Sequence, residues 1–92
     1  MEIVMIKLVS GEVVMGRKGE ETSQELKIEK PMVLMLDPVQ GGIGMMPYDI
    51  HFSQKELESL TVNKDHILHT IDYAKDFEDA YIKQTSGIEV AS

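Results

Sequence analysis

Hydrophobic residues in the first part of the chain occur in short runs separated by polar turns, a pattern typical of β-strands. The run from Ile3 to Val9 is rich in β-branched residues and lacks helical spacing. Ser10-Gly11 separates it from a second apolar run at residues 12–15. Two apolar runs around a Ser-Gly turn predict a β-hairpin.

The next segment predicts a second turn followed by a long strand. Residues 17–25 are polar and favour a turn, after which Leu26 and Ile28 alternate with charged residues as in a half-buried strand. Pro31 cannot donate to a sheet ladder, so it predicts either an edge position or a bulge. The segment from Met32 to Leu36 is apolar on both faces, and its pattern leaves open whether it serves the core or an interface.

The second half predicts further extended pieces. Residues 45–52 read as a strand, and residues 53–59 begin with capping-box spacing, which favours a short helical turn. Residues 60–62 and 66–71 predict two strand pieces around the polar turn at 63–65.

The hydrophobic period changes near the C-terminus. Tyr73, Phe77 and Tyr81 lie at i, i+4 and i+8, which predicts an amphipathic helix with this face packed over the rest of the fold. Asp72 is the expected N-cap and Gly87 the expected C-cap.

Together these elements predict a single, mainly β domain over residues 1–92. About five short antiparallel strands cannot form two packed sheets, so a strongly bent sheet that closes on itself buries its apolar faces best. We expect a small barrel over about residues 2–71, a helix at 73–86 and a frayed tail at 87–92. SH3-like, OB and Sm-like barrels all satisfy this pattern.

Composition narrows the chemistry. The 92 residues include no cysteine, which excludes disulfides and cysteine–zinc sites and agrees with a cytoplasmic location. We find neither a signal peptide nor a membrane-spanning run. The net charge of −7 means that any nucleic-acid site must be a local patch.

No positive case for an enzyme emerges from the sequence. We find no recognisable nucleophile–base arrangement, and we expect no cofactor. The three histidines, His51, His66 and His69, lack carboxylates at ligand spacing, so we expect no metal site.

One stretch carries a family resemblance. Residues 6–16, Ile-Lys-Leu-Val-Ser-Gly-Glu-Val-Val-Met-Gly, resemble the first motif of Sm, LSm and Hfq proteins, in which the two glycines keep the spacing of Gly11 and Gly16. The first glycine suits a tight turn, and the second lets a bent strand pass close to its neighbour. Residues 62–67 resemble the second motif and, loosely, the Lys-His turn of Hfq. The chain resembles a divergent, Sm-like barrel (an SH3-like architecture), of the kind seen in phage.

The resemblance implies a homo-oligomeric ring whose order stays open. In such a ring, the last strand of each subunit pairs with the fourth strand of its neighbour. The β-prone piece at 66–71 has no charged residue after Asp65, so it would be an exposed pairing edge unless a neighbour or the C-terminal helix covered it.

The resemblance also implies a site near the ring's pore. The turn at 63–66 would converge there, where Lys64 would supply a circle of positive charge, and the Thr22–Gln24 loop would line the same pore. An ordinary polar hairpin turn would have the same composition. The candidate nucleic-acid-binding residues are Ser23, Gln24, Asn63, Lys64, Asp65 and His66.

Two functions follow as hypotheses. The first is a ring that binds single-stranded nucleic acid, RNA in preference to DNA, with a role in RNA or DNA processing. The second is an acidic, ring-forming structural or protein-interaction module without nucleic-acid binding. The interaction module is motivated by the net charge and by departures from the family motifs. Thr22, Glu25 and Leu26 replace the Asp, Met and Asn of the first motif, and Asn63-Lys64 replaces the Arg-Gly of the second motif.

Overall fold

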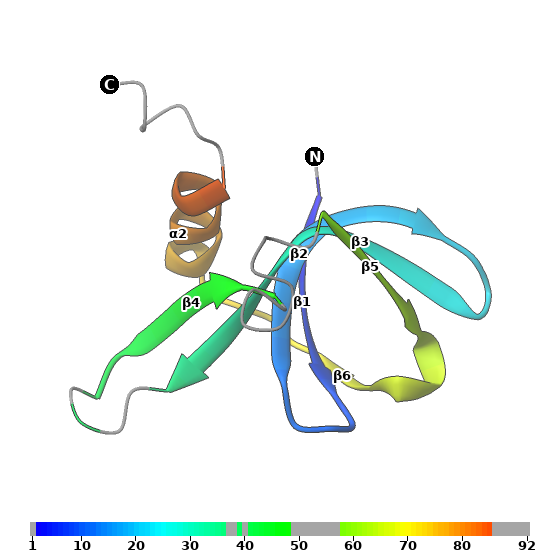
Figure 1. The fold of residues 1–92 in the computed structure, drawn as a ribbon, viewed down its shortest axis with the longest axis horizontal. Helices are drawn as coiled ribbons and strands as arrows, with labels where there is room; N and C mark the ends of the chain where they lie inside the picture. The colour runs from blue at the N-terminus through cyan, green and yellow to red at the C-terminus, as the bar shows by residue number, and fades with distance from the viewer. Residues whose placement is uncertain (1, 37–38, 40, 49–57, 86–92) are drawn as a thin grey trace.

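The computed structural model describes residues 2–36, 39, 41–48 and 58–85. Within these residues the chain forms an antiparallel sheet of six strands, a short 3-10 helix and one α-helix near the C-terminus (Figure 1). The elements are β1 (Ile3–Leu8), β2 (Val13–Glu21), β3 (Glu25–Leu36), β4 (Ile43–Pro47), β5 (Ser59–Asn63), η1 (Lys64–His66), β6 (Ile67–Thr70) and α2 (Lys75–Thr85).

The sheet is bent but does not close into the predicted barrel. Its strands follow the order β4-β3-β2-β1-β6, and β5 pairs with the first half of β3 while β4 pairs with the second half. The turn η1 carries the chain from β5 to β6 without pairing them, so in the described residues β4, β5 and β6 each pair on one edge only. The mainly β, antiparallel prediction is confirmed, whereas the closed barrel and the count of five strands are wrong.

The bend in β3 occurs at a bulge. Met15 pairs with Met32 and Arg17 pairs with Glu29, so two residues of β3 lie opposite one residue of β2. Pro31 is one of these two residues, which confirms the bulge among the two alternatives for this proline. The other is Lys30, whose φ of 50° is rare for a residue with a side chain.

Both glycines of the resemblance have the expected geometry. Gly11 has a φ of 102° in the turn between β1 and β2. A Cβ on Gly16 would overlap Ile28 Cγ2 and lie 2.9 Å from the carbonyl oxygen of Glu29. Gly16 therefore allows β2 and β3 to approach each other at the bulge.

The polar segment predicted as a turn at 17–25 is mostly strand. β2 continues through Glu21, pairing with β3 up to Leu26, and only residues 22–24 turn. The prediction was wrong because backbone pairing extends the strand beyond the point at which its side chains stop being apolar.

Two hydrophobic clusters lie on opposite faces of the sheet. Successive side chains of a strand point to opposite faces, so Met5 and Ile6 enter different clusters, which explains the continuous apolar run of β1. Helix α2 covers one face, and its Tyr81 is fully buried there with Phe77 packed beside it, as predicted. The inner cluster is Ile6, Leu8, Val14, Leu26, Ile28 and Val62, and the outer cluster is Ile3, Met5, Met15, Met32 and Tyr81.

Helix α2 begins later than predicted. Asp72 does not cap it, because residues 71–74 belong to no helix or strand and the helix starts at Lys75. The Ile71 amide donates to the Met5 carbonyl at 2.8 Å, which holds this segment along β1. The predicted C-cap Gly87, the tail after it and the helical turn at 53–59 fall outside the described residues, except for 58 and 59.

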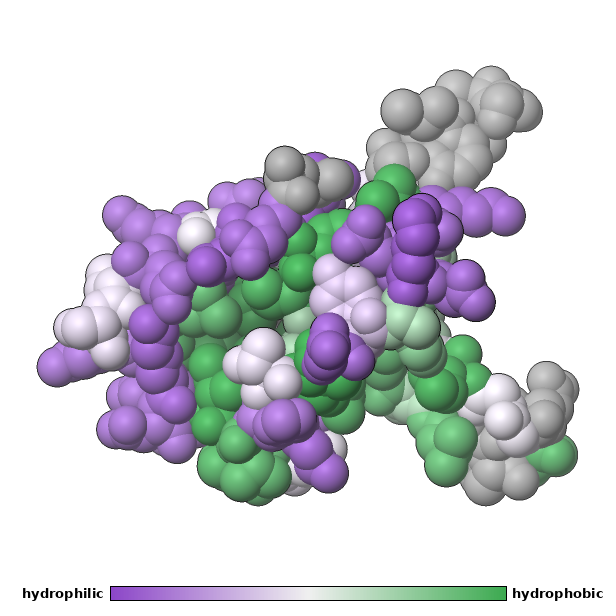
Figure 2. Space-filling view, turned by 180° about the vertical axis from the view of Figure 1, so that it is seen from behind, coloured by the Kyte–Doolittle hydropathy of each residue, from purple (hydrophilic) through white to green (hydrophobic). Residues whose placement is uncertain are grey.

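Apolar surface remains exposed at the ends of β3 and β4. Figure 2 shows hydrophobic side chains gathered across the middle of one face and along the arm that the end of β3 forms with β4. Met32 is buried, whereas Met35 and Leu36 are 49% and 71% exposed, so the apolar run of β3 serves the core at its start and the surface at its end. No helix in the described ranges has the length and apolar character needed to cross a bilayer.

Candidate nucleic-acid interface

The turn η1 lies between two other turns at one end of the sheet. The Lys64 amide donates to the Gln24 carbonyl at 2.8 Å, which joins η1 to the turn between β2 and β3. The Val9 amide donates to the His66 carbonyl at 2.8 Å, which joins η1 to the turn between β1 and β2. The six candidate residues predicted from the sequence are therefore brought together.

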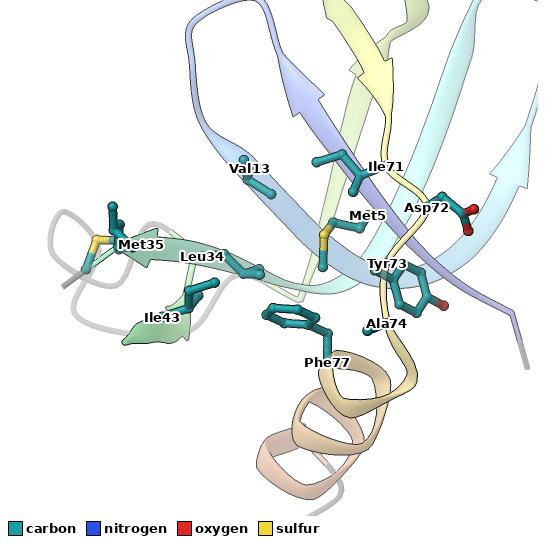
Figure 3. Close-up of a pocket in the computed structure, with 11 residues that line it drawn as sticks. Met5, Val13, Leu34, Met35, Ile43, Ile71, Asp72, Tyr73, Ala74 and Phe77 are labelled. Atoms are coloured by element: carbon teal, nitrogen blue, oxygen red, sulfur yellow. The ribbon is translucent and has the colours of Figure 1, made fainter. Parts of the chain in front are cut away.

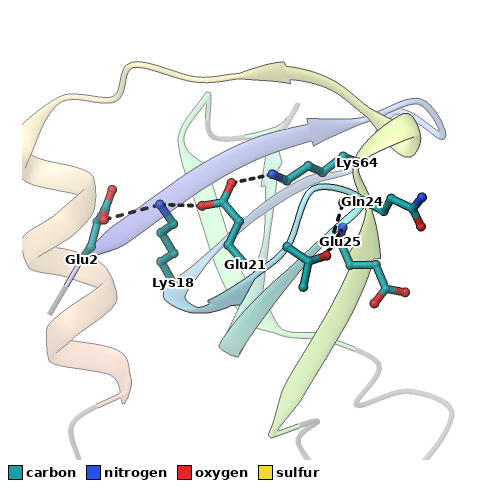
Figure 4. Close-up of polar contacts among 7 residues, drawn as sticks. Glu2, Lys18, Glu21, Gln24, Glu25 and Lys64 are labelled. Carbon is teal, nitrogen blue, oxygen red and sulfur yellow. Dashed lines mark hydrogen bonds and ion pairs between the residues drawn. The ribbon is translucent and has the colours of Figure 1, made fainter.

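Side chains within these turns stabilise the turns themselves. The side-chain Oδ1 of Asn63 accepts from the Asp65 amide at 2.9 Å and caps η1. The Thr22 hydroxyl accepts from the Gln24 and Glu25 amides at 3.2 and 3.0 Å (Figure 4). Thr22 and the Asn63 oxygen thus have structural roles, while the Gln24 side chain points outward and is free to contact a ligand.

Lys64 belongs to a row of alternating charges. Its Nζ lies 2.7 Å from Glu21 Oε2, and the other oxygen of Glu21 lies 2.9 Å from Lys18, which in turn lies 3.8 Å from Glu2 (Figure 4). Hydrogen bonds from Lys64 and then Lys18, together with their charges, lower the pKa of Glu21 to about 2. Glu21 therefore neutralises the positive charge that the sequence analysis assigned to Lys64.

Additional carboxylates make this end of the sheet acidic. Glu25 and Asp65 are exposed on the two joined turns, beside the Glu2–Lys18–Glu21–Lys64 row. Phosphate groups would be repelled here. The arrangement suits hydrogen bonding to neutral base edges better than contact with phosphates.

A cavity of about 310 Å³ opens beside η1. Its lining combines apolar side chains with hydroxyl, amide, imidazole and carboxylate groups, the mixture that small ligands and bases favour. Tyr48 lines it and donates to Glu12 Oε1 at 3.4 Å. The lining residues are Leu8, Val9, Ser10, Glu12, Tyr48, Leu60, Thr61, Val62, Asn63 and His66.

Tyr48 is the aromatic residue of this cavity, and the sequence did not indicate it as a site residue. Tyr48 falls within the strand predicted at residues 45–52, and nothing in the sequence indicates that the end of β4 and η1 meet at one cavity. The Tyr48 amide donates to the Pro31 carbonyl at 3.0 Å, so the bulge of β3 positions this aromatic ring.

A second cavity, of about 360 Å³, lies between α2 and the arm of β3 and β4. Its walls are almost wholly apolar: Phe77 from α2 faces Leu34 and Ile43, while the Asp72 carboxylate points away (Figure 3). The cavity offers few groups that could orient a polar ligand.

The described residues contain no group of three or more side chains that could hold a metal ion. His66 lies in η1 rather than in the strand piece predicted at 66–71, which begins at Ile67. His51 lies outside the described residues.

Comparison with protein-family models finds no match, and comparison with curated proteins finds no relative. The function must therefore be inferred from the chain's own residues.

Proposed function

We propose that this chain assembles into a homo-oligomeric, Sm-like ring that binds single-stranded nucleic acid at the end where its three turns meet. The observation that carries the proposal is the cavity beside η1, where Tyr48 and His66 lie among hydrogen-bonding side chains. RNA rather than DNA, and a role in RNA or DNA processing, follow from the resemblance to the Sm family.

The free sheet edges support assembly. In the described residues β4 and β6 each have one unpaired edge, and the two edges belong to opposite ends of the strand order. Leu68 on β6 remains 63% exposed, so α2 does not cover this strand. Head-to-tail pairing of β6 with β4 of a neighbour would satisfy both edges in every subunit.

The chemistry of the cavity supports recognition of bases. An aromatic ring and an imidazole can stack on a base, and the side-chain amide hydrogens of Asn63 can donate to its edge. Stacking on an aromatic ring contributes about 1–3 kcal/mol per base. This contribution does not require a positive surface, so it is compatible with the acidic surroundings.

The test begins with the mass of the protein by light scattering, where we expect a ring of about five to seven copies. Labelled single-stranded RNA and DNA of equal sequence are then titrated against the protein. Tyr48→Leu and His66→Ala should each weaken RNA binding by roughly tenfold, whereas the exposed Lys83→Ala on α2 serves as the control. Retention of full affinity by both site variants would remove the cavity as the binding site.

The salt dependence provides a second readout. Because Lys64 is paired with Glu21, binding through bases should release few counterions and show a shallow dependence on salt concentration. A steep dependence would indicate that phosphate contacts elsewhere dominate.

The second candidate is an acidic, ring-forming interaction module without nucleic-acid binding. The neutralisation of Lys64 and the exposed carboxylates of Glu25 and Asp65 favour it. In that case the oligomer would persist while neither RNA nor DNA bound, even at low salt.

A further inference from the structure

Three cations that form no ion pair with another described residue lie together on the outer face of the sheet. Of the eight lysine and arginine residues that the structure describes, Lys18, Lys64 and Lys75 form ion pairs with other described residues. Of the other five, Arg17, Lys27 and Lys30 line one cavity of about 350 Å³ with Glu29, Glu58 and Ser59. The cavity therefore has a positive balance on a protein with a net charge of −7.

The sheet register explains why these side chains meet. Arg17 of β2 pairs with Glu29 of β3, which pairs with Ser59 of β5, so all three lie in one row on one face. Lys27 is two residues before Glu29 and shares that face, because side chains alternate along a strand. The cavity thus continues the outer face beyond the part that α2 covers.

The Glu29 carboxylate, which lines the same cavity, does not pair with Arg17. Although Glu29 is its direct partner across the strands, no ion pair joins them. The Glu29 carboxylate is turned toward Gly19, where a Cβ would lie 3.4 Å from Oε2. The absence of a side chain at Gly19 gives this carboxylate a place away from the guanidinium.

Arg17 also has an unsatisfied donor. Its Nε is buried and has no hydrogen-bond partner among the described residues. A buried N–H without an acceptor costs about 1–3 kcal/mol, and such an atom in a folded protein often marks the place of a water or an ion.

The backbone that holds Lys30 is unusual as well. Lys30 adopts a φ of 50°, which residues with side chains seldom do. Its amide donates to the Glu58 carbonyl at 2.7 Å, and its carbonyl accepts from the Tyr81 hydroxyl at 2.8 Å. Its ammonium also donates to the Thr85 carbonyl at 3.5 Å, so strand β5 and helix α2 together hold the lysine at the edge of the cavity.

We propose that Arg17, Lys27 and Lys30 form a binding site for a single phosphate group. A guanidinium and two ammonium groups supply many donors, which match the several oxygens of a phosphate better than the two oxygens of a carboxylate. Glu29 and Glu58 limit the positive balance, so the site favours one phosphate over a polyphosphate. The group comes either from a small phosphorylated compound or from the backbone of a nucleic-acid strand.

The probe for the test is inorganic phosphate, titrated into the intact protein and followed through backbone amide NMR shifts, with chloride of equal ionic strength as the reference. We expect saturable shifts in β2 and β3 around the three cations. The variant Lys27→Gln/Lys30→Gln should weaken phosphate binding by roughly tenfold. The matched variant Lys7→Gln/Lys83→Gln removes the same charge from exposed positions and should leave the affinity unchanged.

Two results would overturn the proposal: shifts that chloride reproduces, or equal weakening in both double variants. Arg17→Lys keeps the charge but loses the paired donors of the planar guanidinium, so it should also weaken phosphate binding. This variant keeps the proposal testable if the double variant misfolds. A single-stranded oligonucleotide distinguishes the two sources, because Lys27→Gln/Lys30→Gln weakens its binding only if the phosphate belongs to the strand. Inorganic phosphate binding does not depend on the cavity beside η1, so this proposal can fail or survive independently of the proposed function.

Discussion

At the scale of single residues, Glu21 connects the two halves of the candidate interface. It accepts from Lys18 on its own strand and from Lys64 on η1, so it binds the turn that follows β5 to the end of β2. These ion pairs are exposed to solvent, so their contribution to stability depends on pH and on salt concentration.

We predict that the contribution of Glu21 to stability disappears in acid. Its pKa is lowered from 4.5 to about 2 in the folded protein, so the unfolded chain binds more protons between these values. The contribution is complete above pH 4.5 and is lost as the pH falls through 2. The thermal midpoints of the wild type and Glu21→Gln should therefore differ at neutral pH and converge near pH 2. A constant difference across this range would contradict the assignment.

Gly16 is a second residue at which a single added atom should change the stability of the fold. A Cβ there would overlap Ile28 and crowd the Glu29 carbonyl, so Gly16→Ala should destabilise the fold by about 1–3 kcal/mol in urea unfolding. Gly42→Ala is the matched control, because a Cβ at that position meets nothing within 4 Å. Equal stability of the two variants would show that β2 and β3 separate easily.

The glycines and the Glu21–Lys64 pair also show what could be predicted from the sequence. The requirement for glycine at Gly11 and Gly16 was predicted from the resemblance of residues 6–16 to the first Sm motif. The neutralisation of Lys64 was not predicted, because Glu21 and Lys64 are far apart in sequence and meet only through the pairing of β3 with β5. Tyr48 was missed for the same reason.

At the scale of elements, β3 organises the fold because β2, β4 and β5 all pair with it. Its bulge at Lys30–Pro31 divides the part that pairs with β5 from the part that pairs with β4. Alternation predicted the strand but not this division, since partners in a sheet are long-range choices. The spacing of apolar residues predicted helix α2 and its buried face. It did not predict the first residue of α2, because the Ile71 amide bonds to β1 and the helix starts after Asp72.

The docking of α2 can be tested through Tyr81. Its hydroxyl lies 3.0 Å from the Glu29 carbonyl and 2.8 Å from the Lys30 carbonyl, at the bulge. Tyr81→Phe keeps the ring and loses this contact, so it should cost about 1–3 kcal/mol. Tyr81→Ala also leaves a cavity and should cost about 3–5 kcal/mol. Urea unfolding measures both variants, and a Tyr81→Phe protein as stable as the wild type would mean that the hydroxyl contributes nothing to docking.

At the scale of the whole molecule, the open sheet implies partners for its edges. We predict that Leu68→Lys on β6 weakens self-assembly, because it places a charge on an exposed strand edge. Ala80→Lys introduces the same charge at an exposed position of α2 and should not affect assembly. Light scattering across a dilution series compares them, and identical masses at all concentrations would remove the β6 edge from the interface.

The placement of the two clusters on opposite faces of one sheet has a consequence for synthesis on the ribosome. β1, β2 and β3 emerge first and can pair as local hairpins, but the inner cluster also needs Val62 and the outer cluster also needs Tyr81. Both apolar faces of the nascent sheet therefore remain open to solvent until the last third of the chain has left the exit tunnel. During that interval the chain is a natural client for chaperones that shield hydrophobic surface.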